Sequence, residues 1–520
     1  MTSSASLLPP LDDRPTLWEH LQTRAMATPS TTRLVAWLVP VLITLVAAAL
    51  RLINLSHPHQ IMFDETYYVK DSWSLWNLGY EAKWGDGADT QLPTGDDSAM
   101  QTTGSFVVHP PLGKWIIALG MAAMGPGSIF GWRVTTALLG SLTVLVVYLL
   151  ALELTRSRTV AVIASGMLAV DGLGIVMSRI ALLDGTLTFF ILLGALFVVQ
   201  DRQRTMPILA ANGRHDEDAP PRMIGPVLWA RPWLIAAGVA LGAASAVKWS
   251  GLYALAAFGL YVVVTDALAR RRAGIALWPT DAAFRQSPAS FLLLVGPALL
   301  TYLVSWTGWL VTAGGYDRQS DANPLIALWK YHESILAFHV GLATPHPYAS
   351  PAWQWPLLLR PTAIWVGDKP TGCGTDHCIA VISSVPNPMI WYASVAAAVY
   401  LLYRFVRGLI ERTPVGPEVT FPLVGLIATY LPWLLVGNRT IFQFYTITMV
   451  PFLVIGLAVA LRELAGRATA PRHRRQSGQR TVAVYLAVVV LVSAFYYPVW
   501  TGMSVPYEFW LIHNWLPGWI

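Results

Sequence analysis

Two adjacent carboxylic acids and three widely separated cations are the residues of this chain best suited to chemistry. Asp64 and Glu65 follow the first long apolar run, and Arg133, Lys248 and Arg439 lie at the edges of later ones. A carboxylate can accept a proton from an attacking hydroxyl group. Guanidinium and ammonium groups donate hydrogen bonds that suit phosphate oxygens. These residue types predict transfer of a group from a phosphate-bearing donor to a hydroxyl acceptor.

A second candidate cluster is the segment from His109 to Lys114, which reads His-Pro-Pro-Leu-Gly-Lys. Its two prolines fix the backbone and keep the preceding residue extended, and an apolar helix is predicted to follow. Two interpretations stay open. The segment is either a rigid entry into that helix or a place where His109 or Lys114 contacts a substrate.

The chain has two cysteines, Cys373 and Cys378, with Asp376 and His377 between them. Four donors within six residues lack the usual spacing of a zinc site, so we predict no metal centre. A local disulfide bond in an oxidising compartment is favoured over two free thiols. The sequence also lacks the glycine-rich loop that binds nucleotide phosphates, and no cofactor is predicted.

The elements that must position these residues are membrane helices. The chain has 520 residues, of which 55% are hydrophobic and 12% are charged, whereas about 25% of a typical soluble protein is charged. This composition excludes a disordered, fibrous or ordinary soluble protein and predicts an all-α polytopic membrane protein. Basic residues that orient such a protein explain the net charge of +6, so no nucleic-acid partner is predicted.

Eleven apolar runs approach the length of about 20 residues that a helix needs to cross the hydrocarbon. They lie near residues 34–52, 134–152, 159–176, 181–200, 232–248, 250–266, 289–312, 389–403, 420–437, 440–461 and 481–499. A further run, 116–132, is interrupted by Gly125-Pro126-Gly127. We predict that this run is a re-entrant or interfacial helix of the first external loop.

The basic residues predict the orientation of these spans. With a cytoplasmic N-terminus, the cytoplasmic segments contain 23 of the 35 Lys and Arg residues, as the positive-inside rule requires. Eleven spans then place the C-terminus outside. The chain divides into a cytoplasmic tail (1–33), a catalytic module (34–312) with a first external loop (53–112), a second external loop (313–388), and a C-terminal module of four spans with an external tail (389–520).

In this orientation the candidate residues all lie at the extracytoplasmic ends of spans, including Asp171, Arg179 and Asp184 between the third and fourth. For any one of them, an ion pair or an extension to lipid headgroups is an equal alternative. The set as a whole converges on one face, with few ionisable residues elsewhere at membrane depth, which favours a shared site. Because nucleotides are absent outside the cell, a phosphate donor there is predicted to be a lipid phosphate.

Several of these segments resemble the protein O-mannosyltransferase family, in the family's order and from about residue 34 to 500. The resemblance is strongest to its actinobacterial, mycobacterial-type members. It is carried by Asp64-Glu65, His109 to Lys114, Arg133, Ser178-Arg179 with Leu182-Leu183-Asp184, Lys248 to Tyr253, and Arg439 to Tyr445. It implies the GT-C fold, a multi-span glycosyltransferase whose active site lies outside the cell membrane.

The resemblance also implies an activity and residue roles. The family transfers mannose from a polyprenyl phosphate to Ser or Thr of secreted proteins, and the Sec translocon is a candidate partner that delivers them. Asp64 would be the general base, and Glu65 would orient the acceptor or the sugar. The donor or other substrate would be bound by Lys248, Arg439, His109, Lys114 and Arg133, with support of the carboxylates of the first loop as the alternative role of Arg133. Support would come from Arg179, Asp184, Tyr253 and Tyr445.

The expected reaction is metal-independent and inverting, because a phosphodiester is a good leaving group and one base then suffices. The second external loop, with about 75 residues, is too short for the MIR domain of eukaryotic members. One alternative keeps the fold and transfers a sugar to a glycolipid or cell-wall glycan. A lipid or solute transporter is disfavoured, because the two halves show no convincing repeat.

Overall fold

The computed structural model describes residues 14–213, 222–437 and 439–520. These residues are predominantly helical, as predicted, and their strands form three short antiparallel pairs. Two parts of the predicted cytoplasmic face lie outside the described residues, namely 1–13 of the tail and 214–221 of the loop before Arg231.

Seven helices among the described residues are long and apolar enough to cross a membrane. Each overlaps one of the predicted spans. They are α2 (Pro29–Leu52), α6 (Ile129–Thr155), α9 (Leu183–Gly213), α11 (Gly251–Arg272), α13 (Ser287–Ser305), α16 (Pro388–Ile410) and α20 (Arg472–Thr501). The span of α13 also includes the preceding α12 (Trp278–Asp281) and a π-helical turn (Ala282–Gln286). The chain is therefore a multi-pass membrane protein.

The other four predicted spans form shorter helices, so a count of eleven crossings stays a prediction. They are α7 (Arg158–Val170) with α8 (Gly172–Val176), α10 (Pro232–Val247), α17 (Pro417–Thr429) with α18 (Leu431–Leu434), and α19 (Val450–Leu464). Two of the breaks have clear causes. Asp171 ends α7 and caps α8 by accepting a hydrogen bond from the Gly174 amide at 3.0 Å, and Pro432 interrupts the run after α17.

Small residues place α10 deep in the bundle, between α9 and α13. A Cβ atom at Gly238 would lie 2.3 Å from the Leu294 carbonyl oxygen, and one at Gly242 would lie 2.4 Å from that of Ala298. Such close backbone approach is typical of helix packing in membranes. As a result, the residues at the two ends of α10, Arg231 and Lys248, are held between neighbouring helices.

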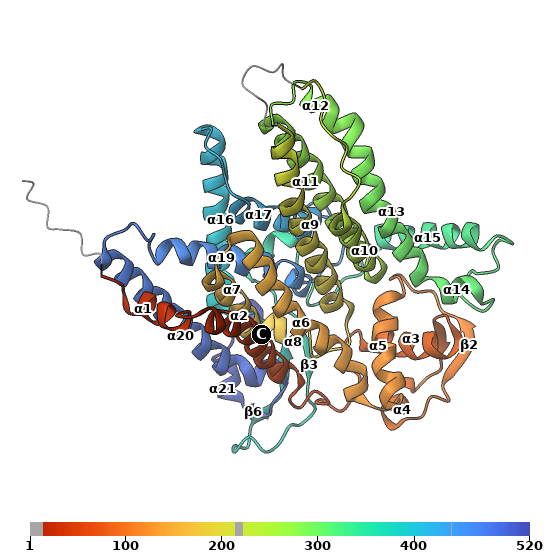
Figure 1. Cartoon of the computed structure of the whole chain (residues 1–520). Helices are drawn as coiled ribbons and strands as arrows, with labels where there is room; N and C mark the ends of the chain where they lie inside the picture. Colours follow the sequence, from red (N-terminus) through yellow and green to blue (C-terminus); the bar gives the residue numbers. More distant parts are fainter. Residues whose placement is uncertain (1–13, 214–221, 438) are drawn as a thin grey trace, which may run out of the picture.

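The segment predicted as the first external loop is a folded layer at the end of the bundle that carries α3, β2 and α5, at the lower right of Figure 1. Its described elements are α3 (Glu65–Leu78), β1 (Ala82–Trp84), α4 (Ala88–Gln91), a 3-10 turn (Leu92–Thr94), β2 (Met100–Gly104) and α5 (Leu112–Met124). β1 and β2 are antiparallel, with Ala82 opposite Gly104. α5 packs on α3 and α6 and ends at the glycine-rich turn that the sequence indicated.

The segment predicted as the second external loop is joined to the C-terminal tail by strand pairing. The elements here are α14 (Thr307–Val311), α15 (Pro324–Gly341), a 3-10 helix (Ala352–Leu357), β3 (Ala363–Val366), β4 (Cys378–Ile379), β5 (Val381–Ser383), β6 (Val505–Pro506), α21 (Tyr507–Leu511) and a last 3-10 turn (Pro517–Trp519). β3 pairs with β5, and β4 pairs with β6 of the tail. The loop and the tail therefore lie on the same side of the molecule. Cys373 and Cys378 form a disulfide bond.

Candidate active site

A cavity of about 350 Å³ lies where α9, α11, α15 and α17 meet the segment that leads into a 3-10 helix, Gln443–Thr448. Six of the residues singled out in the sequence line it. They are His109, Asp184, Lys248, Tyr253, Arg439 and Tyr445. The structure thus brings together residues from both external loops and from four helical segments that are far apart in the chain.

Lys248 and Asp184 form an ion pair at the wall of this cavity, with Nζ 2.8 Å from Oδ2. Lys248 ends α10 in an extended conformation, and Asp184 lies in the first turn of α9. The Lys248 ammonium also lies over the ring of Tyr445, 5.1 Å from its centroid, a favourable cation–π arrangement. Asp184 and Tyr445 therefore both contact the Lys248 ammonium at the cavity, and their role as support residues stays a prediction.

Arg439 is the second cation of the cavity. One Nη2–H group faces Nδ1 of His339 at 3.1 Å, and the guanidinium lies 5.9 Å from the ring of Trp433. Its Nε–H is buried and has no hydrogen-bond partner among the described residues. A half-satisfied guanidinium at a cavity is suited to binding an anionic group.

Asp64 lies beside the cavity, although it does not line it. It occupies the N-cap position of α3, yet its side chain makes no capping bond. Burial raises the pKa of Asp64 from 3.8 to about 6, while Lys248 lowers it and Asp184 raises it further. These interactions place the Asp64 carboxylate within electrostatic range of the Lys248–Asp184 pair. A carboxylate with such a pKa, and with no cation bonded to it among the described residues, is suited to accept a proton.

The backbone before Asp64 is strained. Phe63 has a φ of 50°, a conformation that is unusual for a bulky residue and that persists only when neighbours enforce it. Its ring packs edge-on against Phe442 and Phe444, with centroids 6.2 and 5.7 Å away. The segment after Arg439 therefore helps to set the direction of Asp64.

Glu65, in contrast, is turned into the protein and is completely buried. Arg133 donates to it from Nε at 2.7 Å and from Nη2 at 2.8 Å. The Ala181 and Met62 amides donate to it at 2.9 and 3.1 Å. With its oxygens engaged in this way, Glu65 anchors the first loop and does not line the cavity, and its expected role at the acceptor or sugar stays a prediction.

Arg133 and Lys114 contact the first loop, which for Arg133 corresponds to the alternative of supporting the carboxylates of that loop. Arg133 is fully buried, and besides Glu65 it bonds the carbonyl oxygens of Leu55, Pro58 and Gln60. Lys114 is 1% exposed and pairs with Glu81 and, at 3.8 Å, with Asp71. Neither residue lines the cavity. Both hold the first loop in place because their partners come from that loop.

His109 is the member of its segment that faces the cavity. Its Nδ1 atom is buried and has no hydrogen-bond partner among the described residues. Burial lowers the pKa of His109 well below its usual value, and Lys248, His339, Lys114 and Arg439 lower it further. A neutral histidine with a free ring nitrogen remains available to a substrate hydroxyl.

Arg179 caps the end of α2 and does not line the cavity. It donates to the carbonyl oxygens of Arg51, Ile53 and Asn54 at 3.0, 2.7 and 3.0 Å. Sequence reasoning did not single out Arg51, which is buried and bonds the Ser178 hydroxyl at 3.2 Å. An arginine that close to the end of an apolar run was the available signal for it.

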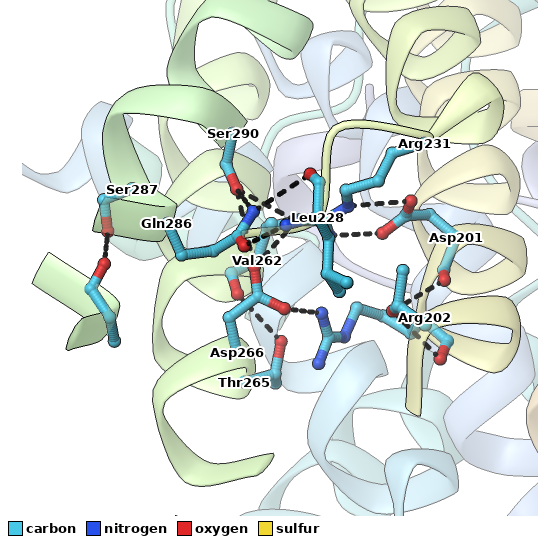
Figure 2. Close-up of polar contacts among 12 residues, drawn as sticks. Asp201, Arg202, Leu228, Arg231, Val262, Thr265, Asp266, Gln286, Ser287 and Ser290 are labelled. Carbon is cyan, nitrogen blue, oxygen red and sulfur yellow. Dashed lines mark hydrogen bonds and ion pairs between the residues drawn. The ribbon is translucent and has the colours of Figure 1, made fainter. Parts of the chain in front are cut away.

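A second polar cluster lies at the opposite ends of α9, α10 and α11, and the sequence prediction missed it. Arg231 bonds both oxygens of Asp201, at 3.1 and 2.5 Å, and also Asp266 at 2.8 Å. Arg202 pairs with Asp266 from the other side. Figure 2 shows these four side chains pointing toward one another, with Ser290 above them. These charges are buried and paired with one another, whereas the sequence placed Asp201, Arg202 and Arg231 in a solvated loop.

Comparison with known proteins agrees with this architecture. Residues 41–271 match the dolichyl-phosphate-mannose-protein mannosyltransferase family, and residues 325–519 match the C-terminal four-helix region of protein O-mannosyltransferases. The polyprenol-phosphate-mannose–protein mannosyltransferase of Mycobacterium tuberculosis is 34% identical over 94% of this chain and 92% of its own length. The Corynebacterium glutamicum protein of that name is 32% identical over 88% of each.

A solved structure shows the same fold. The Saccharomyces cerevisiae Pmt1–Pmt2 complex, bound to its sugar donor, matches with a TM-score of 0.72 at 16% identity, over 97% of this chain and 94% of that one. This chain therefore belongs to the protein O-mannosyltransferase family, with the GT-C architecture that its sequence indicated.

Proposed function

We propose that this protein transfers mannose from polyprenyl-phosphate-mannose to Ser or Thr hydroxyls of secreted proteins, at the extracytoplasmic face of the cell membrane. The relatives that it matches over nearly its whole length are named for this donor and for protein acceptors. The observation that carries the proposal is the arrangement of Asp64, to which no cation is bonded among the described residues, beside a cavity that presents Lys248 and Arg439.

In this proposal the cavity holds the donor. Lys248 and Arg439 contact the phosphate, which carries negative charge that grows as the sugar leaves. The apolar residues of the lining, among them Leu187, Ile191 and Val436, suit the first units of the prenyl chain. Asp184 keeps Lys248 oriented toward the phosphate through their 2.8 Å ion pair. His109, with its unpartnered Nδ1, would contact the sugar.

The chemistry is a single displacement at the anomeric carbon. Asp64 accepts the proton of the acceptor hydroxyl while the hydroxyl oxygen bonds to the carbon. The bond from that carbon to the phosphate oxygen breaks with its electron pair, and the polyprenyl phosphate leaves on the side of Lys248 and Arg439. The configuration inverts, because attack and departure occur on opposite faces. We expect no requirement for a metal ion, and activity in the presence of EDTA would bear this out.

The decisive experiment incubates membranes that contain the protein with labelled polyprenyl-phosphate-mannose and a Ser/Thr-rich peptide. Wild type is expected to label the peptide, and Asp64→Asn is expected to lose labelling. Asp96→Asn is the matched control, because Asp96 is a carboxylate of the same loop whose polar contacts are local, to Ser98. Label found in a glycolipid fraction and not in the peptide would favour the glycan-transferring alternative. Peptide labelling by Asp64→Asn would exclude Asp64 as the base.

A further inference from the structure

The guanidinium of Arg439 is held by a histidine of the second external loop that the sequence did not single out. His339 lies in the last turn of α15 and lines the same cavity. Its Nδ1 atom is 3.1 Å from Nη2 of Arg439, and its Nε2 atom is 3.0 Å from the carbonyl oxygen of Val108. One imidazole therefore links α15 to the first loop and to the donor-side cation.

These two contacts define the protonation state of the ring. A carbonyl oxygen only accepts hydrogen bonds, so Nε2 of His339 carries the proton and donates it to Val108. A guanidinium only donates, so Nδ1 must be the unprotonated acceptor. Burial and the neighbouring Arg439 and Lys248 cations lower the pKa of His339 to about 4, which agrees with a neutral ring. The geometry and the charge environment thus specify one tautomer.

The surroundings restrict the imidazole further. Its ring lies 5.7 Å from that of Trp249 and 5.6 Å from that of His109, centroid to centroid. Arg439 is bounded on another side by Trp433. Arg439 lies on a segment without regular secondary structure. Among the described residues, the hydrogen bond to His339 is the side-chain hydrogen bond that orients its guanidinium.

We propose that His339 is a positioning residue that fixes the Arg439 guanidinium for the donor phosphate, by accepting a hydrogen bond on Nδ1. This inference rests on the proposed function and extends it, because it makes α15 of the second external loop part of the donor site. The two ring nitrogens of His339 then have different roles. Nε2 donates to the carbonyl oxygen of Val108 and connects α15 to the first loop, whereas Nδ1 accepts from Arg439.

Two substitutions of His339 test the roles of its two ring nitrogens separately. In His339→Gln the amide nitrogen can replace Nε2 and keep the bond to Val108, but the acceptor for Arg439 is lost. In His339→Asn the amide oxygen can replace Nδ1 and accept from Arg439, but the bond to Val108 is lost. We expect His339→Gln to lower kcat/KM for the lipid donor about tenfold, as for loss of a hydrogen bond to a charged group. His339→Asn should stay within about threefold of wild type, and KM for the peptide should change in neither variant.

Tyr331→Phe is the matched control for loosening of α15. The Tyr331 hydroxyl donates to the carbonyl oxygen of Val107 at 2.8 Å and accepts from its amide at 2.9 Å. Its removal weakens the contact between α15 and the first loop without touching Arg439. We expect it to lower the thermal stability of the purified protein and to leave kcat/KM for the donor unchanged.

Arg439→Ala, alone and combined with His339→Gln, completes the test. If His339 acts through Arg439, the double variant is no worse than Arg439→Ala. Equal losses in His339→Gln, His339→Asn and Tyr331→Phe would overturn the inference in favour of a structural role for α15. If Arg439→Ala lowered kcat/KM for the donor and His339→Gln did not, the inference about His339 would be overturned and the proposed function would stand. Donor kinetics unchanged in Arg439→Ala would instead remove Arg439 from the donor site and overturn that part of the proposed function.

Discussion

Two buried charge clusters lie at opposite ends of the same helices. The outer cluster contains Asp184 of α9 and Lys248 at the end of α10, whereas the inner cluster contains Asp201 of α9 and Arg231 at the start of α10. Seventeen residues separate the members on each helix, a distance of about 25 Å at 1.5 Å per residue. That distance is close to the thickness of a membrane's hydrocarbon core.

The clusters differ in how completely their charges are satisfied. In the inner one, the Arg231 guanidinium bonds two carboxylates and the Ser290 hydroxyl. In the outer one, a cavity remains, Asp64 has no bonded cation, and Arg439 has an unpartnered Nε–H among the described residues. Paired buried charges hold helices together, whereas buried charges with spare bonding capacity are available for chemistry. We therefore expect substitutions in the two clusters to act on different quantities.

The largest expected effect is the loss of transfer in Asp64→Ala. Loss of a general base typically costs about 10²–10⁴-fold in rate. Because the Asp64 side chain makes no capping bond, the thermal stability of the purified variant should match that of wild type. Initial rates with labelled donor and thermal unfolding in detergent measure the two quantities. A variant that lost both together would mean that Asp64 is structural, like its neighbour Glu65.

The inner cluster should show the opposite behaviour. Arg231→Met leaves Asp201 and Asp266 without their shared partner, and breaking a buried pair costs about 3–5 kcal/mol. We expect a large drop in thermal stability, with nearly normal transfer per folded molecule at low temperature. Arg204→Met is the matched control, because Arg204 is an exposed residue of the same helix α9. A stable Arg231→Met protein without activity would break the distinction between the two clusters.

A smaller effect is expected for Lys248→Met. Loss of a hydrogen bond to a charged group costs about 1.5–3 kcal/mol, and each 1.4 kcal/mol is about tenfold, so kcat/KM for the donor should fall roughly 10- to 100-fold. KM for the acceptor peptide should stay constant, because the proposed contact is to phosphate. Lys248→Arg should recover part of the loss. A change in the KM for the peptide alone would indicate that Lys248 contacts the acceptor and not the donor phosphate.

The comparison also explains which residues the sequence could reveal. Asp64, Lys248 and Arg439 were recognisable because an ionisable residue at the edge of an apolar run is costly unless it has a role. Arg231 and Asp201 gave a weaker signal, because they lie in a segment that also reads as a solvated cytoplasmic loop. Their burial depends on the close packing of α10 between its neighbours, which only the folded structure shows.

The partners of these side chains could not be predicted from the sequence for a similar reason. Glu65 and Arg133 are 68 positions apart, so nothing local distinguishes an anchored carboxylate from the free one beside it. His339 looked like an ordinary histidine of a loop, since its function depends on Arg439, 100 positions away. The long helices were predictable from apolar runs, whereas breaks such as the one at Asp171 depend on a tertiary contact to the Asn387 amide at 3.0 Å.

The most subtle prediction concerns pH. Asp64 must be ionised to accept a proton, and its pKa is raised to about 6, so kcat/KM should fall as the pH drops below that value. Asp184 raises this pKa and Lys248 lowers it. Asp184→Asn should therefore move the acidic limb of the pH profile to lower pH, and Lys248→Met should move it to higher pH. Opposite shifts from two substitutions in one ion pair are not expected from a general loss of structure. Profiles of kcat/KM between about pH 4 and 8 report the free enzyme, and identical acidic limbs in both variants would show that the titrating base is not Asp64.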